Sequence, residues 1–98
     1  MKFGLSCSEL EFMEKVILGP LRQRGARVFL FGSRARGTHQ PYSDVDLLID
    51  ADADLSAFIG GLSETLEEGN FPYKVDLVDA RSLESSYRAS VERDKILL

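Results

Sequence analysis

The sequence has only one residue that could crosslink chains and no hydrophobic run long enough to enter a membrane. It contains one cysteine, Cys7, which cannot form a disulfide within the chain and suits a reducing compartment. The N-terminal segment carries Ser6, Ser8 and Glu9 where a signal peptide would have an apolar core. No run of residues approaches the roughly 20 apolar positions that span a bilayer. We therefore expect a cytoplasmic protein with no membrane association.

Proline and sequence repeats are also scarce. Only three prolines occur in 98 residues, no low-complexity tract or internal repeat is visible, and 44% of the residues are hydrophobic. These features argue against disorder and favour a globular fold. A chain of this length builds one hydrophobic core and leaves no room for a second, substrate-binding domain, so we expect a single domain over residues 1–98.

Acidic residues are missing from one long segment of a chain whose net charge is −4. Residues 15–43 contain six basic side chains and no acidic one, whereas residues 44–84 contain eleven acidic side chains and two basic ones. This asymmetry permits an anion-binding site inside an acidic protein. Non-specific binding to nucleic acid draws its affinity from positive charge, so we expect no direct binding of nucleic acid.

Hydrophobic spacing predicts a first helix near the N-terminus. Either of two capping boxes could open it, Ser6 with Glu9 or Ser8 with Glu11, and apolar residues then recur at helical spacing. Pro20 follows a glycine and should end or kink this helix.

Two further helices are predicted in the second half of the chain. A clear apolar stripe over residues 55–66 follows Asp52 and Asp54, either of which can cap the helix, and Gly69 stops it. A weaker apolar stripe near the C-terminus predicts a last helix opened by Ser82.

Short apolar runs predict strands over residues 27–31, 45–49 and 73–78, and a last extended piece over residues 95–98. Residues 45–49 form a nearly continuous apolar run, which indicates a central strand covered on both faces. The helix between the second and third strands is long enough for a crossover between parallel strands. The expected fold class is α/β (α+β), a small mixed β-sheet with helices packed against it.

Three aspartates interrupt or precede the predicted strands. Asp44 and Asp46 are two residues apart, so their side chains project from the same side of an extended segment, about 7 Å apart at the backbone. Asp76 interrupts the third strand, and a buried carboxylate without a partner is costly. With one histidine and no nearby cysteine, these oxygen ligands favour Mg²⁺ or Mn²⁺ over zinc. By itself, Asp44 is equally compatible with a turn or a helix cap.

Gly32 and Ser33 follow the first predicted strand and open a short helix. Free backbone N–H groups and a small hydroxyl at such a turn can meet phosphate oxygens. The chain lacks the Gly-Lys-Ser/Thr ending of a P-loop and the three spaced glycines of a dinucleotide-binding turn. Most Gly-Ser pairs are only turns, so this pair indicates a phosphate-binding site only in combination with other motifs.

The segments "GSRARG", "SDVDLLID" and "VDLVD" resemble the minimal nucleotidyltransferases of the DNA polymerase β superfamily. The pattern of that family is Gly-Ser, ten intervening residues and Asp-x-Asp. Gly32-Ser33 and Asp44-Val45-Asp46 match that spacing without a gap, and a third aspartate follows one helix later. The resemblance covers nearly the whole chain and implies the nucleotidyltransferase fold of the polymerase β type.

The resemblance also implies a role for each motif residue. Asp44 and Asp46 would hold two divalent cations, Mg²⁺ or alternatively Mn²⁺, together with the nucleotide phosphates. Asp76 would complete the metal site and help to deprotonate the acceptor hydroxyl, while Gly32 and Ser33 would bind the triphosphate. Because phosphoryl and nucleotidyl transfer depend mainly on positioning and charge neutralisation, this small set of groups is chemically sufficient.

The other polar residues near the motifs have less specific expected roles. Arg36 is a candidate nucleotide-binding residue that would stabilise the charge of the triphosphate, whereas we expect Arg34 to be solvated. His39 lies in a polar turn and is expected at the surface rather than in catalysis. Tyr42 and Lys74 could contact a base or a phosphate, although packing or solvation is their expected role.

The chain ends shortly after Asp76, so we expect another molecule to supply the acceptor. Free-standing minimal members of the family resemble the antitoxin half of two-gene toxin–antitoxin modules, whose partner is an all-helical HEPN ribonuclease. In that setting the enzyme transfers AMP from ATP to a tyrosine of the toxin and silences it. The resemblance therefore implies an Mg²⁺-dependent protein adenylyltransferase that uses ATP and forms a complex with a HEPN toxin.

Three alternatives remain open from the sequence. The chain could transfer a nucleotide to a small molecule such as an aminoglycoside, although no acceptor domain is present. It could instead neutralise its partner by contact alone, with the aspartates holding metal but catalysing no reaction. An inactive, degenerate domain is disfavoured because all three aspartates are intact.

Overall fold

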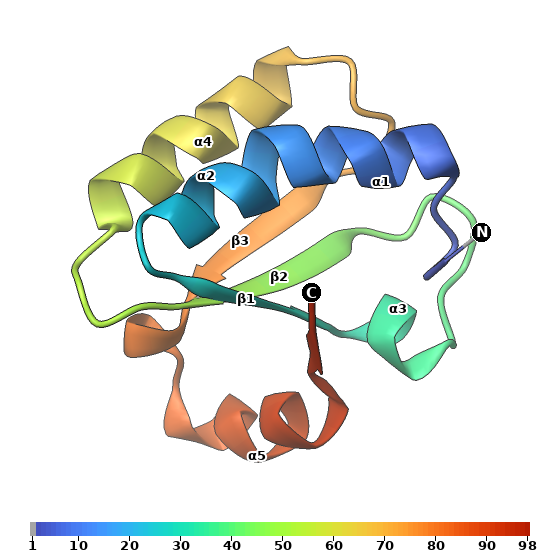
Figure 1. Cartoon of the computed structure of the whole chain (residues 1–98). Coiled ribbons are helices and arrows are strands. Elements are labelled where there is room, and N and C mark those ends of the chain that lie inside the picture. The colour runs from blue at the N-terminus through green and yellow to red at the C-terminus, as the bar shows by residue number, and fades with distance from the viewer. Residues whose placement is uncertain (1) are drawn as a thin grey trace.

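A computed structural model describes residues 2–98 of the chain. Figure 1 shows its helices and strands. The elements in chain order are α1 (Cys7–Met13), the π-helical segment η1 (Glu14–Leu18), α2 (Gly19–Gln23), β1 (Arg27–Phe31), α3 (Ser33–Arg36), β2 (Val45–Asp50), α4 (Ser56–Glu68), β3 (Val75–Asp79), the 3₁₀ turn η2 (Ala80–Ser82), α5 (Ser85–Asp94) and β4 (Ile96–Leu97). None of the helices within residues 2–98 is long and apolar enough to cross a membrane.

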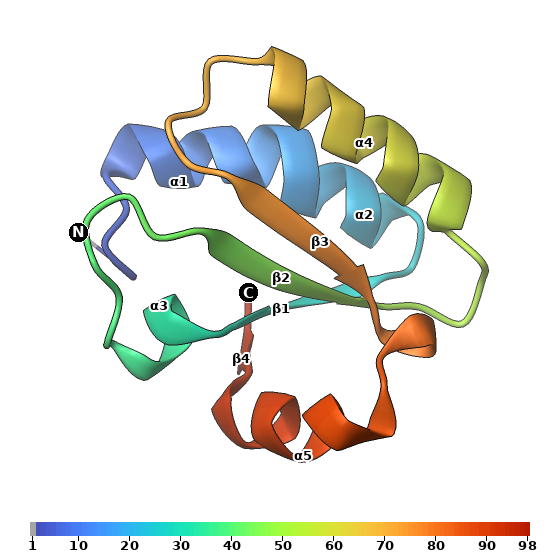
Figure 2. The same ribbon diagram turned by 180° about the vertical axis from the view of Figure 1, so that it is seen from behind.

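Four strands form one mixed sheet in the order β3-β2-β1-β4. β2 and β3 are parallel and α4 makes the crossover between them, whereas β1 runs antiparallel to both β2 and β4. Figure 1 and Figure 2 show α1, α2 and α4 on one face of the sheet and α5 on the other. The expected α/β fold with a small mixed sheet is confirmed.

The hydrophobic core divides into two clusters because successive side chains of a strand point to opposite faces. Val45, Leu47 and Ile49 of β2 belong to the larger cluster, on the face covered by the N-terminal helices and α4. Leu48 points the other way and packs in the smaller cluster with Val91 of α5. β2 is therefore buried on both faces, as its apolar run predicts.

The first helix begins at one of its two predicted capping boxes. The Glu9 backbone N–H donates to Ser6 Oγ at 3.2 Å, and the Ser6 N–H donates to the Glu9 carboxylate at 2.8 Å. Ser8 lies inside α1, and its hydroxyl is within hydrogen-bond distance of that of Ser6. The cap at Ser6 therefore satisfies a backbone donor at the start of the helix that would otherwise lack a partner.

Replacing Ser6 with alanine is expected to lower the free energy of unfolding by about 1 kcal/mol, because the Glu9 N–H loses its acceptor. Ser8→Ala is the matched control and should change it by less than about 0.5 kcal/mol. Denaturant unfolding of both variants measures the difference. Equal losses in the two variants would contradict the assignment of the cap to Ser6.

The helical run does not end at Pro20 but continues to Gln23, with the π-helical segment η1 immediately before α2. The Gly19 N–H bonds to the Glu14 carbonyl, which lies one residue further back than the acceptor in an α-helix. This wider turn accommodates the proline within one continuous helical run, which Figure 1 shows passing from α1 into α2.

The two helices of the second half begin at residues other than the predicted caps. The N-cap of α4 is Leu55 and neither predicted aspartate, although Asp54 just before it accepts a bond from the Ser56 N–H at 3.0 Å, and this bond lowers the pKa of Asp54. The last helix begins at Ser85 rather than after Ser82. The reason is that the Asp79 carboxylate first closes the turn η2 by accepting a backbone N–H at 2.9 Å.

Candidate active site

The candidate site lies at the end of the sheet where β2 and β3 begin and β1 ends. In the parallel pairing of β2 with β3, Asp46 stands directly beside Asp76. Alternation along the two strands places both carboxylates on the face that carries Leu48 and Val78, which pack toward α5. The structure thus brings together the two aspartates that interrupt otherwise apolar strands.

The carboxylate of Asp46 lies in an unfavourable electrostatic environment. Burial of the carboxyl, followed by the negative charges of Asp76 and Asp44, raises the pKa of Asp46 from 3.8 to about 6. The charge of Arg36 opposes this shift without cancelling it. Lys74 is the nearest lysine to the pair, with its Nζ 3.6 Å from Asp76 Oδ1. A bound divalent cation would relieve the repulsion among these carboxylates.

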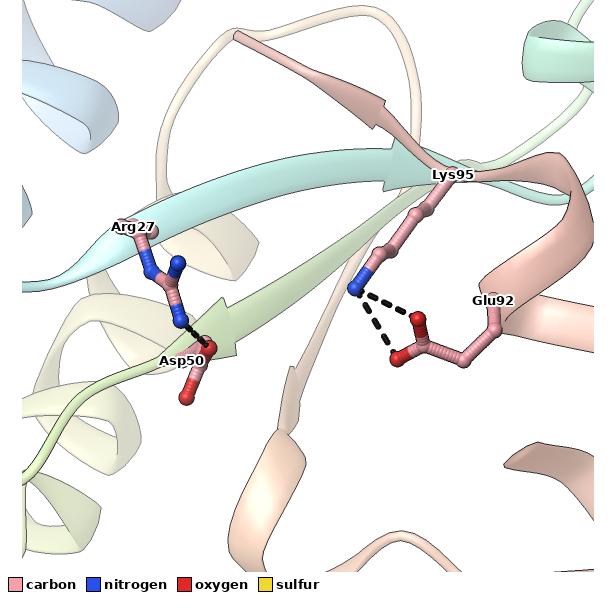
Figure 3. Close-up of polar contacts among 4 residues, drawn as sticks. All are labelled: Arg27, Asp50, Glu92 and Lys95. Atoms are coloured by element: carbon pink, nitrogen blue, oxygen red, sulfur yellow. Dashed lines mark hydrogen bonds and ion pairs between the residues drawn. The ribbon is translucent and has the colours of Figure 1, made fainter.

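Asp50 lies on the same face of β2 as Asp46 but has a structural partner. β1 pairs Arg27 with Asp50, and Figure 3 shows the ion pair between their side chains. At the other end of the same two strands, the residue opposite Asp46 is Phe31, which offers no charge. One acid of β2 is neutralised across the sheet, whereas the other needs a proton or a cation.

Asp44 also raises the pKa of Asp46, but by less than Asp76 does. The Asp44 side chain is exposed. Among residues 2–98, no three acidic, histidine or cysteine side chains are already close enough together to enclose a metal ion. The donor chemistry nevertheless fits a hard divalent cation, since Asp46 and Asp76 present carboxylate oxygens at paired positions. A site with three carboxylate ligands would require the Asp44 side chain to turn inward.

The Gly-Ser turn lies directly against Asp46. Gly32 has φ +78° and ψ −158°, a combination that is almost confined to glycine. A Cβ atom at this position would also overlap Asp46 Oδ2. Glycine is therefore required for both backbone conformation and close approach. Ser33 follows as the first residue of α3 and is partly buried.

Arg36 lies near the site, but its guanidinium already has a partner. Its Nη1 is 3.3 Å from Oδ2 of Asp94, the last residue of α5, and the Arg36 side chain remains 46% exposed. This contact ties α3 to α5. A phosphate group would have to compete with Asp94 for the charge of Arg36.

Two residues that sequence patterns place at the surface are buried in the structure, one fully and one in part. The expectation of a solvated Arg34 is wrong, because its guanidinium donates to backbone carbonyls and lies over the Tyr73 ring. His39 is partly buried, and within residues 2–98 its Nδ1 has no hydrogen-bond partner. Arg34 and Arg36 stand in the same short helix, so the local sequence carries no signal that separates them.

A cavity of about 450 Å³ opens beside the loop that leads into Asp44. Its walls include Arg34, His39, Tyr42 and Tyr73, and the centres of the two tyrosine rings are 6.5 Å apart. This volume is in the range of pockets that hold small ligands. Sequence patterns do not reveal the cavity because its walls come from segments far apart along the chain.

Comparison with known proteins places this chain in a family. The profile of the nucleotidyltransferase domain matches residues 14–98. The probable protein adenylyltransferase MntA of Haemophilus influenzae is 31% identical over 72 residues, which cover 72% of this chain and 63% of that protein. The chain therefore spans less than two thirds of the length of this curated relative.

Solved structures share the fold over most of the chain. A candidate minimal nucleotidyltransferase superposes with a TM-score of 0.71 at 31% identity, covering 96% of this chain and 97% of the other. A toxin–antitoxin structure with AMP-PNP gives a TM-score of 0.68 at 28% identity and covers 86% of this chain and 70% of that one. The resemblance to minimal nucleotidyltransferases is confirmed. The chain belongs to the nucleotidyltransferase domain family.

Proposed function

We propose that the chain is a divalent-metal-dependent nucleotidyltransferase that transfers AMP from ATP to a hydroxyl group of a partner toxin and so acts as an antitoxin. The observation that carries this proposal is the carboxylate pair of Asp46 and Asp76, closed on one side by Gly32. Carboxylates at adjacent strand positions suit divalent cations. Membership of the nucleotidyltransferase domain family supports the reaction class.

Each motif residue has a role in this reaction. Asp44, Asp46 and Asp76 would hold two Mg²⁺ ions, for which Mn²⁺ could substitute. When bound, the ions supply positive charge to the phosphate oxygens. Gly32 and Ser33 bind the triphosphate, and Asp76 accepts the proton of the acceptor hydroxyl. The acceptor oxygen is then in line with the α-phosphate, so that its bond to phosphorus forms as the bond to pyrophosphate breaks.

The charge of Arg36 fits a supporting role. Its guanidinium is close enough to act on Asp46, yet it is partly exposed and held by Asp94. An incoming triphosphate carries more negative charge than one carboxylate, so Arg36 can exchange Asp94 for a phosphate oxygen.

The nucleotide and the acceptor are proposed from the relatives. MntA of Haemophilus influenzae is named as a probable protein adenylyltransferase, and one similar structure is a toxin–antitoxin with AMP-PNP. These descriptions support ATP as the nucleotide and a toxin protein as the acceptor. We infer further that the acceptor is a tyrosine hydroxyl of a HEPN-family toxin, with which this chain forms a complex.

Incubating the chain with ATP, Mg²⁺ and the protein encoded by the neighbouring gene, followed by intact-mass measurement, tests the transfer. We expect the partner to gain one adenylyl group on a tyrosine and EDTA to prevent the gain. Silencing of the partner without a change in mass, equally by wild type and Asp46→Asn, would instead support neutralisation by contact. Transfer to an aminoglycoside in the absence of the partner would favour the small-molecule alternative.

A further inference from the structure

Arg34 is the one charged residue among residues 2–98 that is buried, with 2% of its surface exposed. Its Nη1 donates to the Phe3 carbonyl at 2.8 Å, its Nη2 to the Ser43 carbonyl at 2.8 Å, and its Nε to the same Ser43 oxygen at 3.2 Å. The guanidinium carbon lies 4.5 Å from the centre of the Tyr73 ring. The side chain therefore uses both its donors and its flat face.

These contacts join the segments that carry the separate parts of the candidate site. Arg34 belongs to α3 and directly follows the Gly-Ser turn. Ser43 directly precedes Asp44 at the entry to β2, and Tyr73 lies shortly before Asp76 at the entry to β3. A single guanidinium thus connects the turn with the entries to both acidic strands.

The Ser43 carbonyl lies in a loop that also has hydrogen bonds of its own. The Ser43 N–H donates to the Gln40 carbonyl at 3.1 Å, and the Gln40 N–H donates to Ser43 Oγ at 2.8 Å. Just beyond, the Val45 N–H donates to the Lys74 carbonyl at 2.8 Å and joins β2 to β3. The Arg34 guanidinium links the end of this loop, directly before Asp44, back to α3.

The chemistry of the residue indicates why an arginine is buried here. Within residues 2–98, Arg34 forms no ion pair with an acid. Burying an unpaired charge is costly, and an apolar side chain would fill the space at lower cost. Arginine offers several N–H donors in one plane, which satisfy two carbonyls while the plane stacks on a ring. Directional hydrogen bonds hold the Phe3 and Ser43 carbonyls in defined positions, and an apolar side chain has no donors with which to form them.

We propose that Arg34 is a positioning residue, which sets the spacing of Asp44 and Asp76 from the Gly-Ser turn by holding the segments that precede these two aspartates. The role rests on the proposed function in one respect, because the carboxylates that Arg34 positions are those proposed to hold the divalent ions. It acts through the Ser43 backbone and the Tyr73 ring.

Arg34→Lys tests this role, with Arg24→Lys as the matched control. Lysine keeps the charge but cannot bond two carbonyls and stack on the ring at once. Arg24 also lies over an aromatic ring, that of Phe58 at 3.8 Å, but it joins the end of α2 to α4. Mn²⁺ is titrated into the full chain and the electron paramagnetic resonance signal of the free ion gives the affinity. We expect Arg34→Lys to weaken Mn²⁺ binding about tenfold or more, and Arg24→Lys to change it by less than about twofold.

Amide hydrogen exchange provides a readout that does not depend on metal. The N–H groups of Ser43 and Val45 should exchange faster in Arg34→Lys than in wild type, and at the wild-type rate in Arg24→Lys. Should Arg34→Lys fail to fold, Tyr73→Leu provides the same comparison against Tyr73→Phe, which keeps the ring.

Unchanged exchange in Arg34→Lys would overturn the proposal, as would equal changes in the Arg24→Lys control. Faster exchange with undiminished Mn²⁺ affinity would also overturn it, since the carboxylates would then be positioned without Arg34. If the wild-type chain binds no Mn²⁺, the metal site of the proposed function is contradicted. The hydrogen-exchange comparison then decides by itself whether Arg34 positions the segments before Asp44 and Asp76.

Discussion

Replacing Asp46 with asparagine is expected to lower the rate of nucleotidyl transfer by about a thousandfold or more while making the metal-free protein more stable. The loss follows because asparagine keeps the shape of the side chain but not the negative charge that holds a divalent cation. The gain in stability follows because the Asp46 carboxylate is held beside Asp76 and Asp44, and burial and these charges raise its pKa to about 6. One substitution should therefore move activity and stability in opposite directions.

The same pKa shift predicts how stability depends on pH. The folded protein holds the Asp46 proton more tightly than the unfolded chain does, because the pKa rises from 3.8 to about 6 on folding. The stabilising contribution of this group is fully present below pH 3.8 and is lost as the pH rises through about 6. Solvent screens a carboxylate that is only partly buried, so Asp46→Asn should raise the free energy of unfolding at pH 7.5 by about 1 kcal/mol. At pH 4 the gain should be smaller.

Asp50→Asn is the matched control for this prediction. Asp50 lies on the same face of β2, but its charge is paired with Arg27. The Asp50→Asn variant should keep its transferase activity and should not be stabilised at pH 7.5. Denaturant unfolding in EDTA and the intact-mass assay measure both quantities. An Asp46→Asn variant that still transfers AMP at the wild-type rate would remove the carboxylate pair from the proposed mechanism.

The acids of the candidate site could be found in the sequence because their signal is local. Asp46 and Asp76 each interrupt a short run of apolar residues, and an acid within a predicted apolar strand needs a partner or a cation. The distance from Gly32-Ser33 to Asp44 is likewise a property of the sequence alone. Local patterns therefore predict the order of the main helices and strands, and they single out Asp46 and Asp76, which the structure places at paired strand positions; the roles of these residues stay a prediction.

The roles of Asp50 and Arg34 could not be predicted because they depend on how distant segments meet. Asp46 and Asp50 flank the same apolar run on the same face. Only the antiparallel register with β1 brings Arg27 to Asp50 and Phe31 to Asp46. The burial of Arg34 similarly requires the N-terminal segment, the loop before β2 and the residues before β3 to converge.

Gly32→Ala is expected to lower the rate of transfer by about a hundredfold or more, since small displacements of reacting groups have effects of this size. The added Cβ would overlap Asp46 Oδ2, so either the turn or the carboxylate must move. The backbone at φ +78° and ψ −158° is also strained for alanine. Together these effects should lower the free energy of unfolding by about 2–3 kcal/mol, measured by denaturant unfolding.

Gly25→Ala separates the effect of backbone strain on stability from the effect of overlap with Asp46. Gly25 also has a positive φ of +81°, but a Cβ there would meet no atom within 4 Å. This variant should lose about 1 kcal/mol through backbone strain and keep full activity below its melting temperature. In an Asp46→Ala background the overlap disappears, so Gly32→Ala should then cost at least about 0.5 kcal/mol less than in wild type. An equal cost in both backgrounds would mean that backbone strain alone requires glycine at this turn, and that its close approach to Asp46 contributes nothing.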